Sequence, residues 1–196
     1  KKLSPKKRAE LYEIIIKEAA SIGIGVVHED QIDQMNILNA TILSMKKAVD
    51  ALDLSADVLL VDGNLKKIST IKQESIIKGD SKSQSIAAAS IIAKVTRDRM
   101  MEQYDKVFPG YGLSRNMGYG TREHMDALKD LSSTPIHRQS FKPVSTYMPT
   151  FKDIDNISKL SIQIAAAKLI QDGHQILNLD YDSSDVHILS YKDNNY

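Results

Sequence analysis

Residues 57–62 read Asp-Val-Leu-Leu-Val-Asp, an apolar run between two acidic residues. The turn-forming pair Gly63-Asn64 follows directly. A strand that is apolar at every inner position is typically buried on both faces, as in a sheet covered by helices. Helices are predicted on both sides of the run: at 38–52, where apolar residues recur at helical spacing, and at about 85–107, before Pro109-Gly110. The sequence therefore predicts an α/β fold.

The rest of the chain continues this alternation of helices and strands. Ser4-Pro5 supplies the N-cap and the first position of a helix that runs to about Ala20. Residues 135–149 show no periodicity and are expected to form a meandering segment and linker. The other expected elements are strands at 23–27 and 74–78, a helix at 121–131 with Thr121 as its N-cap, a helix at 157–171 that Gly173 ends, and one or two strands within 176–189.

The composition excludes several classes of protein. Without cysteine, the 196-residue chain has no disulfide framework, no cysteine zinc site and no thiol nucleophile, which fits a cytoplasmic location. No apolar run approaches the ~18 residues of a membrane span, and no secretory signal is expected, so we expect no membrane partner. The net charge of +1 combines a body of net +4 with an acidic tail, 145–196, of net −3, which is compatible with a nucleic-acid partner.

Asp62 and Asp98 are candidate ligands of a metal ion. Asp62 ends the apolar strand, where ligand sites of α/β sheets gather, although an Asp before Gly63 also fits a simple turn. Asp98 continues the apolar stripe of its helix, although the arginines on either side of it also fit a surface salt bridge. Two inward carboxylates suit Mg²⁺ or Mn²⁺, which prefer oxygen ligands, and a two-metal site needs about two more.

Two further segments are candidates for binding. Residues 78–83, Lys-Gly-Asp-Ser-Lys-Ser, precede a helix and fit either an anion site or a plain capped helix start. Tyr119 lies between Gly118 and Gly120, where it either stacks on a sugar or base or belongs to a structural turn. The five histidines of the chain lack the spacing of a zinc site.

Seven segments, taken together and in this order, resemble the ribonuclease HII family over residues 1–144. They are KKLSPKKR (1–8), NILNAT (36–41), VDGN (61–64), KGDSKS (78–83), IAAASIIAKVTRDR (86–99), GYGTREH (118–124) and TPIHRQSF (134–141). The resemblance implies an RNase H-like mixed sheet flanked by helices. It also implies an endonuclease that cuts the RNA strand of RNA–DNA hybrids, incises at ribonucleotides embedded in duplex DNA, and leaves 5′-phosphomonoesters. The complete form is expected to be a monomer.

The resemblance also assigns roles to residues of this chain. The family holds two Mg²⁺ or Mn²⁺ ions with four acidic residues, and two of the four match Asp62 and Asp98. The tyrosine with which the family reads the ribose matches Tyr119. Four more residues lie in or next to family segments near the phosphate backbone of the substrate: Lys1, Lys82, Ser85 and Lys94.

One motif of the family is absent. The other two acidic residues belong to a D-E-x-G-R-G motif that precedes these segments in the family and occurs nowhere in the 196 residues. The chain thus resembles the family without its first two strands, which lie between the strands expected at 23–27 and 57–62. We expect the chain to be inactive alone, with a non-catalytic nucleic-acid-binding or protein-interaction fragment as the alternative. Unpaired edges at these two strands are expected to favour aggregation.

The end of the chain resembles another family. Residues 160–189 are similar to the start of the YraN-like family, which has a restriction-endonuclease-like fold, but Ser184-Asp185-Val186-His187 stands where that family has Gly-Glu-Ile-Asp. The expected organisation is a partial ribonuclease HII-like domain at 1–144, a linker at 145–157, and a degenerate or truncated small α/β appendage at 158–196.

Overall fold

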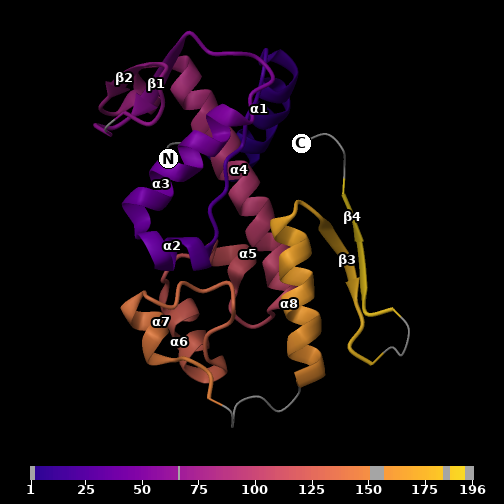
Figure 1. Ribbon diagram of the computed structural model, residues 1–196. Coiled ribbons are helices and arrows are strands. Elements are labelled where there is room, and N and C mark those ends of the chain that lie inside the picture. The colour runs from indigo at the N-terminus through magenta and orange to yellow at the C-terminus, as the bar shows by residue number, and fades with distance from the viewer. Residues whose placement is uncertain (1–2, 66, 151–156, 183–185, 193–196) are drawn as a thin grey trace. The chain divides into compact units, whose positions relative to one another are not determined.

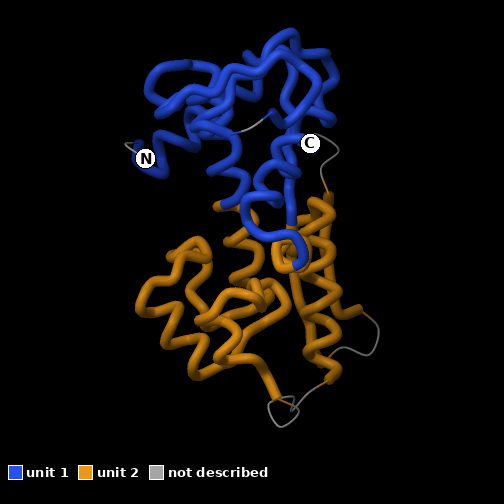
Figure 2. The backbone as a smooth tube through the Cα atoms, turned by 60° about the vertical axis from the view of Figure 1, so that its left-hand side comes forward, with its two compact units in different colours: residues 1–27, 34–97 blue, residues 28–33, 98–196 orange. Residues whose placement is uncertain are grey.

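The structure, a computed structural model, describes residues 3–65, 67–150, 157–182 and 186–192 (Figure 1). It divides into two compact units, unit 1 with residues 1–27 and 34–97, and unit 2 with residues 28–33 and 98–196 (Figure 2). The elements are α1 (Pro5–Glu18), α2 (Glu29–Met35), α3 (Ile37–Asp50), β1 (Val58–Asp62), β2 (Lys72–Ile76), the 3-10 helix η1 (Gly79–Ser81), α4 (Gln84–Val107), α5 (Leu113–Asn116), α6 (Arg122–Leu131), α7 (Lys142–Thr146), α8 (Ile157–Gln171), β3 (Gln175–Leu179) and β4 (Ile188–Tyr191).

The sheet of unit 1 consists of β1 and β2, which pair in parallel with Val58 opposite Lys72 and Asp62 opposite Ile76. Leu59 and Val61 are buried in a core with side chains of α3. On the opposite face of the same strand, Val58 and Leu60 are 38% and 39% exposed. The prediction of a strand buried on both faces is therefore wrong for this sheet, because packed side chains cover its α3 face while Val58 and Leu60 stay open on the other.

The strand predicted at 23–27 does not form. This segment has no regular secondary structure and lies against α3 instead. A Cβ atom on Gly23 or Gly25 would overlap the carbonyl oxygen of Ala48 or Ser44, so the two glycines let the chain run directly on the helix backbone. Residues 23–27 thus pack against a helix where pairing with a strand was expected.

Helices α1 and α4 form a second core in unit 1. Helix α1 begins at Pro5 with Ser4 as its N-cap, as predicted, and the Ser4 hydroxyl accepts a hydrogen bond from the amide of Lys7 at 3.2 Å. Tyr12 of α1 packs with Ile92 and Val95 of α4. The apolar stripe of α4 that the sequence indicated is therefore a core face in unit 1.

The core of unit 2 combines side chains from both sides of residue 144. Tyr104 and Val107 of α4 pack with Leu128 of α6 and with Ala166 and Ile176 from the C-terminal part of the chain. Helix α8 ends at Gln171, and Gly173 follows it as predicted, with a φ of +89° in the left-handed conformation that favours glycine. The predicted boundaries at 144 and 157 stay predictions.

The antiparallel pair of β3 and β4 follows α8 and runs beside it (Figure 1). Side chains of α4 also hold the backbone of this pair. Gln103 accepts a hydrogen bond from the amide of Ile176 at 3.0 Å, and Lys106 donates one to its carbonyl oxygen at 3.0 Å. Both polar groups of this buried backbone are thereby satisfied.

Two short helices of unit 2, α5 and α7, were not predicted, and α7 lies within the stretch expected to meander. Helix α2 was not predicted either. Its residue Asp33 accepts hydrogen bonds from the amides of Gln139 at 2.7 Å and Ser140 at 3.2 Å. These bonds join residues 28–33 to the rest of unit 2.

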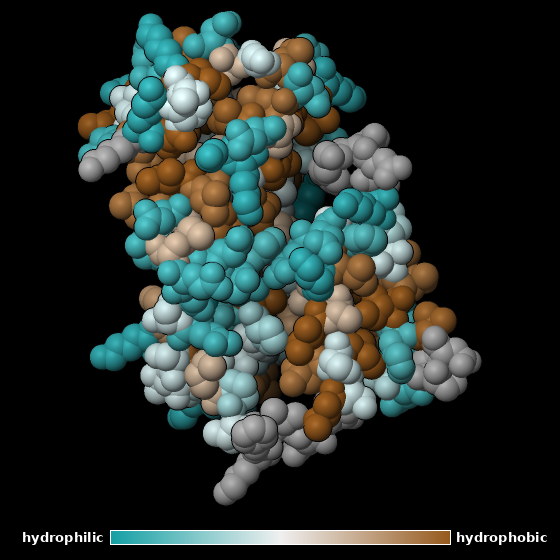
Figure 3. All heavy atoms as spheres, viewed as in Figure 1, coloured by the Kyte–Doolittle hydropathy of each residue, from teal (hydrophilic) through white to brown (hydrophobic). Residues whose placement is uncertain are grey.

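Apolar side chains reach the surface in both units (Figure 3). The largest exposed fractions include 63% for Ile77 in unit 1 and 75% for Ile157 in unit 2. In the part of the chain that the structure describes, no helix is both long enough and apolar enough to cross a membrane.

We expect residues 1–196 to self-associate. One edge of β1 has no strand partner among the described residues, and the strand itself carries an exposed apolar side chain, Leu60. Leu60→Lys should weaken the association several-fold by placing a charge on this strand. Sedimentation velocity over a concentration series measures the effect, and Ile77→Lys, outside both strands, is the matched control. A monomer that unfolds cooperatively in both near- and far-UV circular dichroism would contradict the prediction.

Candidate functional site

Asp62 is the last residue of β1 and projects from the carboxyl end of the strand. The ladder continues past it, since the amide of Gly63 donates to the carbonyl oxygen of Ile76 at 3.0 Å. The carboxylate itself is exposed, and its Oδ1 accepts a hydrogen bond from the amide of Gly79 at 2.8 Å. Among the described residues, Oδ2 makes no hydrogen bond, so one oxygen is held by the backbone and the other is open to a ligand.

Residues 78–83, a separate candidate in the sequence, form the turn that holds Asp62. Lys78 has a φ of 57°, and the carbonyl oxygen of Gly79 accepts hydrogen bonds from the amides of Lys82 at 2.9 Å and Ser83 at 2.8 Å. A methyl group on Gly79 would lie 2.5 Å from Cδ1 of Ile86 and 3.4 Å from the Oδ1 of Asp62. This role of Gly79 was not predicted, since the contact joins residues 17 positions apart.

The candidate phosphate contacts lie at and beyond this turn. Lys82 and Ser85 are exposed at the start of α4, and Lys94 is half-buried farther along the same helix. One amide of the first turn of α4 already has a partner within the protein, because the Ser83 hydroxyl accepts a hydrogen bond from the amide of Ile86 at 3.4 Å. Lys1 lies outside the described residues.

Asp98 lies on α4, half-buried, and belongs to unit 2, whereas Asp62 belongs to unit 1. Each carboxylate is therefore described within its own unit, and a shared metal site stays a prediction. Among the described residues, no group of three or more His, Asp or Glu side chains is arranged to hold a metal ion. Asp62, with one oriented and one open oxygen, fits the role of a single carboxylate ligand of a hard cation.

Tyr119 lies in a loop of unit 2 whose backbone is tightly held. The tyrosine is 63% exposed, but its amide donates to the carbonyl oxygen of Asn116 at 2.9 Å. The buried side chain of Asn116 donates to the carbonyl oxygen of Tyr111 at 2.7 Å and accepts from the amide of Gly118 at 2.9 Å. The exposed ring of Tyr119 is thus attached to a backbone that hydrogen bonds hold in place.

Two buried histidines lie next to this loop, and no role was predicted for either of them. Their Nε2 atoms are 3.0 Å apart, and Nδ1 of His124 is 3.1 Å from the carbonyl oxygen of Tyr119. The groups that face His137 are the His124 imidazole, the Tyr111 ring and Thr134. Burial, with the neighbouring His124, lowers the pKa of His137 to about 4, and burial raises the pKa of Tyr111 to about 12.

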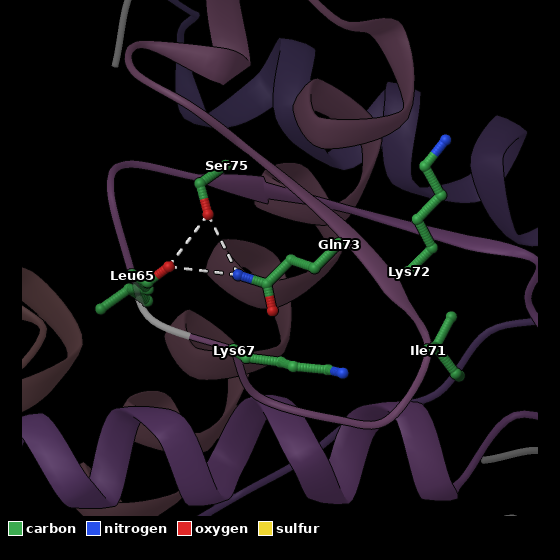
Figure 4. A pocket seen from close by; sticks show the side chains of 6 residues that line it. All are labelled: Leu65, Lys67, Ile71, Lys72, Gln73 and Ser75. Atoms are coloured by element: carbon green, nitrogen blue, oxygen red, sulfur yellow. Dashed lines mark hydrogen bonds between the residues drawn. The ribbon is translucent and has the colours of Figure 1, made fainter.

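An open hollow beside β2 does not contain any of the candidate residues (Figure 4). Its polar groups bond one another: the carbonyl oxygen of Leu65 accepts from Gln73 at 3.2 Å and from Ser75 at 3.0 Å. Gln73 also accepts from the amide of Ile68 at 2.9 Å. The polar groups around the hollow therefore serve to hold the loop that precedes β2. It is lined by Leu65, Lys67, Ile71, Lys72, Gln73 and Ser75.

Comparison with known proteins gives one consistent family. Residues 1–144 match the sequence model of ribonuclease HII. The ribonuclease HII of Lactobacillus acidophilus is 54% identical over 147 residues, which cover 75% of this chain and 58% of that protein. The ribonuclease HII of Clostridioides difficile is 55% identical over 141 residues, which cover 72% of this chain and 55% of that protein. The chain thus spans less than two thirds of the length of these relatives.

A solved structure agrees on the fold. The crystal structure of the ribonuclease H2 from Pyrococcus horikoshii matches with a TM-score of 0.66 at 20% sequence identity, over 79% of this chain and 80% of that one. The α/β, RNase H-like fold expected from the sequence is confirmed by this match.

Lowering the pH is expected to destabilise unit 2 through His137. Its pKa is about 4 when folded against an ordinary 6.5, so between these values the unfolded chain binds more protons. The contribution of His137 to the free energy of unfolding is complete above pH 6.5. It falls by roughly 3 kcal/mol as the pH drops to 4 and changes no further below that pH.

Chemical denaturation between pH 8 and pH 3.5 measures this dependence. His137→Gln, which cannot titrate, should flatten the dependence between pH 6.5 and 4, whereas His174→Gln, at a half-buried histidine elsewhere in unit 2, should leave it in place. Equal slopes for the wild type and His137→Gln would show that His137 does not resist protonation.

Proposed function

Because the chain belongs to the ribonuclease HII family, we propose that its function is that of a ribonuclease H. The proposed reaction is hydrolysis of the RNA strand of RNA–DNA hybrids and incision at ribonucleotides embedded in duplex DNA, leaving 5′-phosphomonoesters. One observation carries the proposal: the carboxylate of Asp62 accepts a hydrogen bond from the amide of Gly79 at 2.8 Å. This bond joins two of the family segments at one end of the sheet. A carboxylate at a strand end beside a lysine-bearing turn suits phosphodiester chemistry.

The proposed roles of the acidic residues follow from their chemistry. Asp62 and Asp98 supply oxygen ligands for Mg²⁺ or Mn²⁺, and the amide of Gly79 holds Oδ1 of Asp62 in place. Bound in pairs, such ions activate water and stabilise the leaving oxygen. The exposed position of Asp62 leaves its side chain within reach of a cation from solvent.

The substrate is proposed to lie along residues with long or aromatic side chains. Lys82 and Lys94 neutralise phosphates and Ser85 donates to them, with Lys1 as a further contact. Tyr119 is proposed to read the ribose, whose 2′-hydroxyl distinguishes RNA from DNA. Its 63% exposure supports this role, because most of the residue is open to solvent. The cytoplasmic location, and a monomer as the complete form, stay predictions from the sequence.

A second candidate function is non-catalytic binding of nucleic acid or of a protein. The absence of the D-E-x-G-R-G motif from the 196 residues favours it for this chain, since two of four acidic ligands do not balance the charge of two metal ions. The two functions differ in catalysis and share the binding surface. Measurements of cleavage and of binding therefore separate them.

Residues 1–196 are expected not to cut a labelled DNA duplex that carries one ribonucleotide, in either Mg²⁺ or Mn²⁺. The reason is the missing pair of carboxylates. Denaturing gel electrophoresis measures the products, with the ribonuclease HII of Lactobacillus acidophilus as the positive control. Metal-dependent incision that Asp62→Asn abolishes would show instead that this chain holds a working site.

Binding to the same duplex is expected to persist and to weaken with salt. Lys82→Ala should reduce the slope of log affinity against log salt by about 1, the loss of one phosphate contact. Lys46→Ala, which removes another exposed lysine of unit 1, is the control and should leave the slope unchanged. Tyr119→Ala should instead lower the preference for the ribonucleotide over all-DNA duplex. Fluorescence anisotropy gives both readouts, and absence of any duplex binding would refute the proposed function.

A further inference from the structure

The buried histidines beside Tyr119 have a fixed direction of hydrogen bonding. At one end, the amide of Thr134 lies 3.1 Å from Nδ1 of His137. A backbone amide only donates, so this nitrogen must accept and carries no proton. A neutral His137 then carries its proton on Nε2, and its low pKa, about 4, keeps it neutral near pH 7.

The direction continues through His124. The Nε2–H of His137 donates to Nε2 of His124 across 3.0 Å, so the accepting nitrogen is unprotonated. The proton of His124 is therefore on Nδ1, which lies 3.1 Å from the carbonyl oxygen of Tyr119. A carbonyl oxygen only accepts, so this last contact agrees with the order deduced from the other end.

The chain from Thr134 through His137 and His124 to Tyr119, here called the histidine bridge, ends on the backbone of an exposed residue. The carbonyl oxygen of Tyr119 also accepts the amide of Thr121 at 2.8 Å. The ring of Tyr111 packs against both imidazoles, with centroid distances of 6.3 Å to His124 and 5.2 Å to His137. The bridge is thus buried and packed, while the side chain that it supports is open to solvent.

We propose that His124 and His137 are positioning residues that hold the Tyr119 backbone and thereby set the discrimination between ribonucleotide and deoxyribonucleotide. This proposal rests on the proposed function, in which Tyr119 contacts the ribose. A loop that loses the bridge keeps its exposed ring but holds it over a wider range of positions. The preference for ribose therefore falls, whereas the salt-dependent affinity for duplex, which comes from lysines, stays the same.

Two substitutions at one position separate the halves of the bridge. His124→Asn places an amide nitrogen near the position of Nδ1, so it keeps the donor to Tyr119 and loses the contact with His137. His124→Gln places an amide oxygen near the position of Nε2, so it keeps the acceptor for His137 and loses the donor to Tyr119. Both replace the same buried ring with a polar amide, and circular dichroism checks that both fold.

The expected result is an asymmetry between these variants. His124→Gln should lose about fivefold of the preference for a duplex with one ribonucleotide over all-DNA duplex, the size of one hydrogen bond. His124→Asn should retain most of that preference, and His174→Gln, at the half-buried histidine elsewhere in unit 2, should retain all of it. Equal losses in the two His124 variants would overturn the proposal, since they would show a purely structural role for the ring.

Two readouts without nucleic acid separate this proposal from the proposed function. Imidazole ¹⁵N NMR of the full chain should show the proton on Nε2 of His137 and on Nδ1 of His124. Amide hydrogen exchange in residues 118–121 should be faster in His124→Gln than in His124→Asn. The opposite tautomers, or equal exchange, would overturn the histidine bridge. If Tyr119→Ala leaves the ribonucleotide preference unchanged, the ribose-reading role fails, and these two readouts then decide the bridge alone.

Discussion

Helix α4 is one continuous element of 24 residues that supplies buried side chains to both units. Ile92 and Val95 belong to a core of unit 1, and Tyr104 and Val107 belong to the core of unit 2. An α-helix fixes the rise and rotation between its residues, so each side chain that it carries has a set position along it. Most of the candidate functional residues lie on this helix or in the turn before it, and their placement depends on its packing.

Features set by neighbouring residues could be predicted from the sequence. Ser4 and Thr121 cap helices as predicted, because a cap needs only the amides of the next turn. Gly173 ends α8 for an equally local reason, its positive φ. The prediction of a strand at 23–27 was wrong because a strand needs a partner strand. In the described part of the chain, this segment packs against the backbone of α3 instead. The exposure of Val58 and Leu60 likewise depends on which faces are covered, which periodicity does not reveal.

The candidate site divides in the same way. The end of an apolar strand identified Asp62, and the glycines on either side identified Tyr119, since both signals lie within a few residues. The contact of Asp62 with Gly79 and that of His124 with His137 join positions 17 and 13 residues apart. The histidines were considered only as zinc ligands, and the absence of zinc spacing hid another use of an imidazole, which accepts at one nitrogen while it donates at the other.

Asp62 and Tyr119 show how an exposed group is positioned without being buried. Burying the carboxylate of Asp62 would disfavour its charged form, and burying the ring of Tyr119 would remove it from a ligand. In both places the protein fixes the backbone, or one atom of the side chain, with groups that are themselves buried: Gly79 for the first, Asn116 and His124 for the second. The histidine pair can serve this purpose only while His137 is neutral, because a second proton on that ring would lie on Nδ1, 3.1 Å from the amide of Thr134, and would place two donors against each other. The low pKa of His137 follows from the same burial that makes the pair rigid, so the support of Tyr119 and its resistance to protonation have one physical cause.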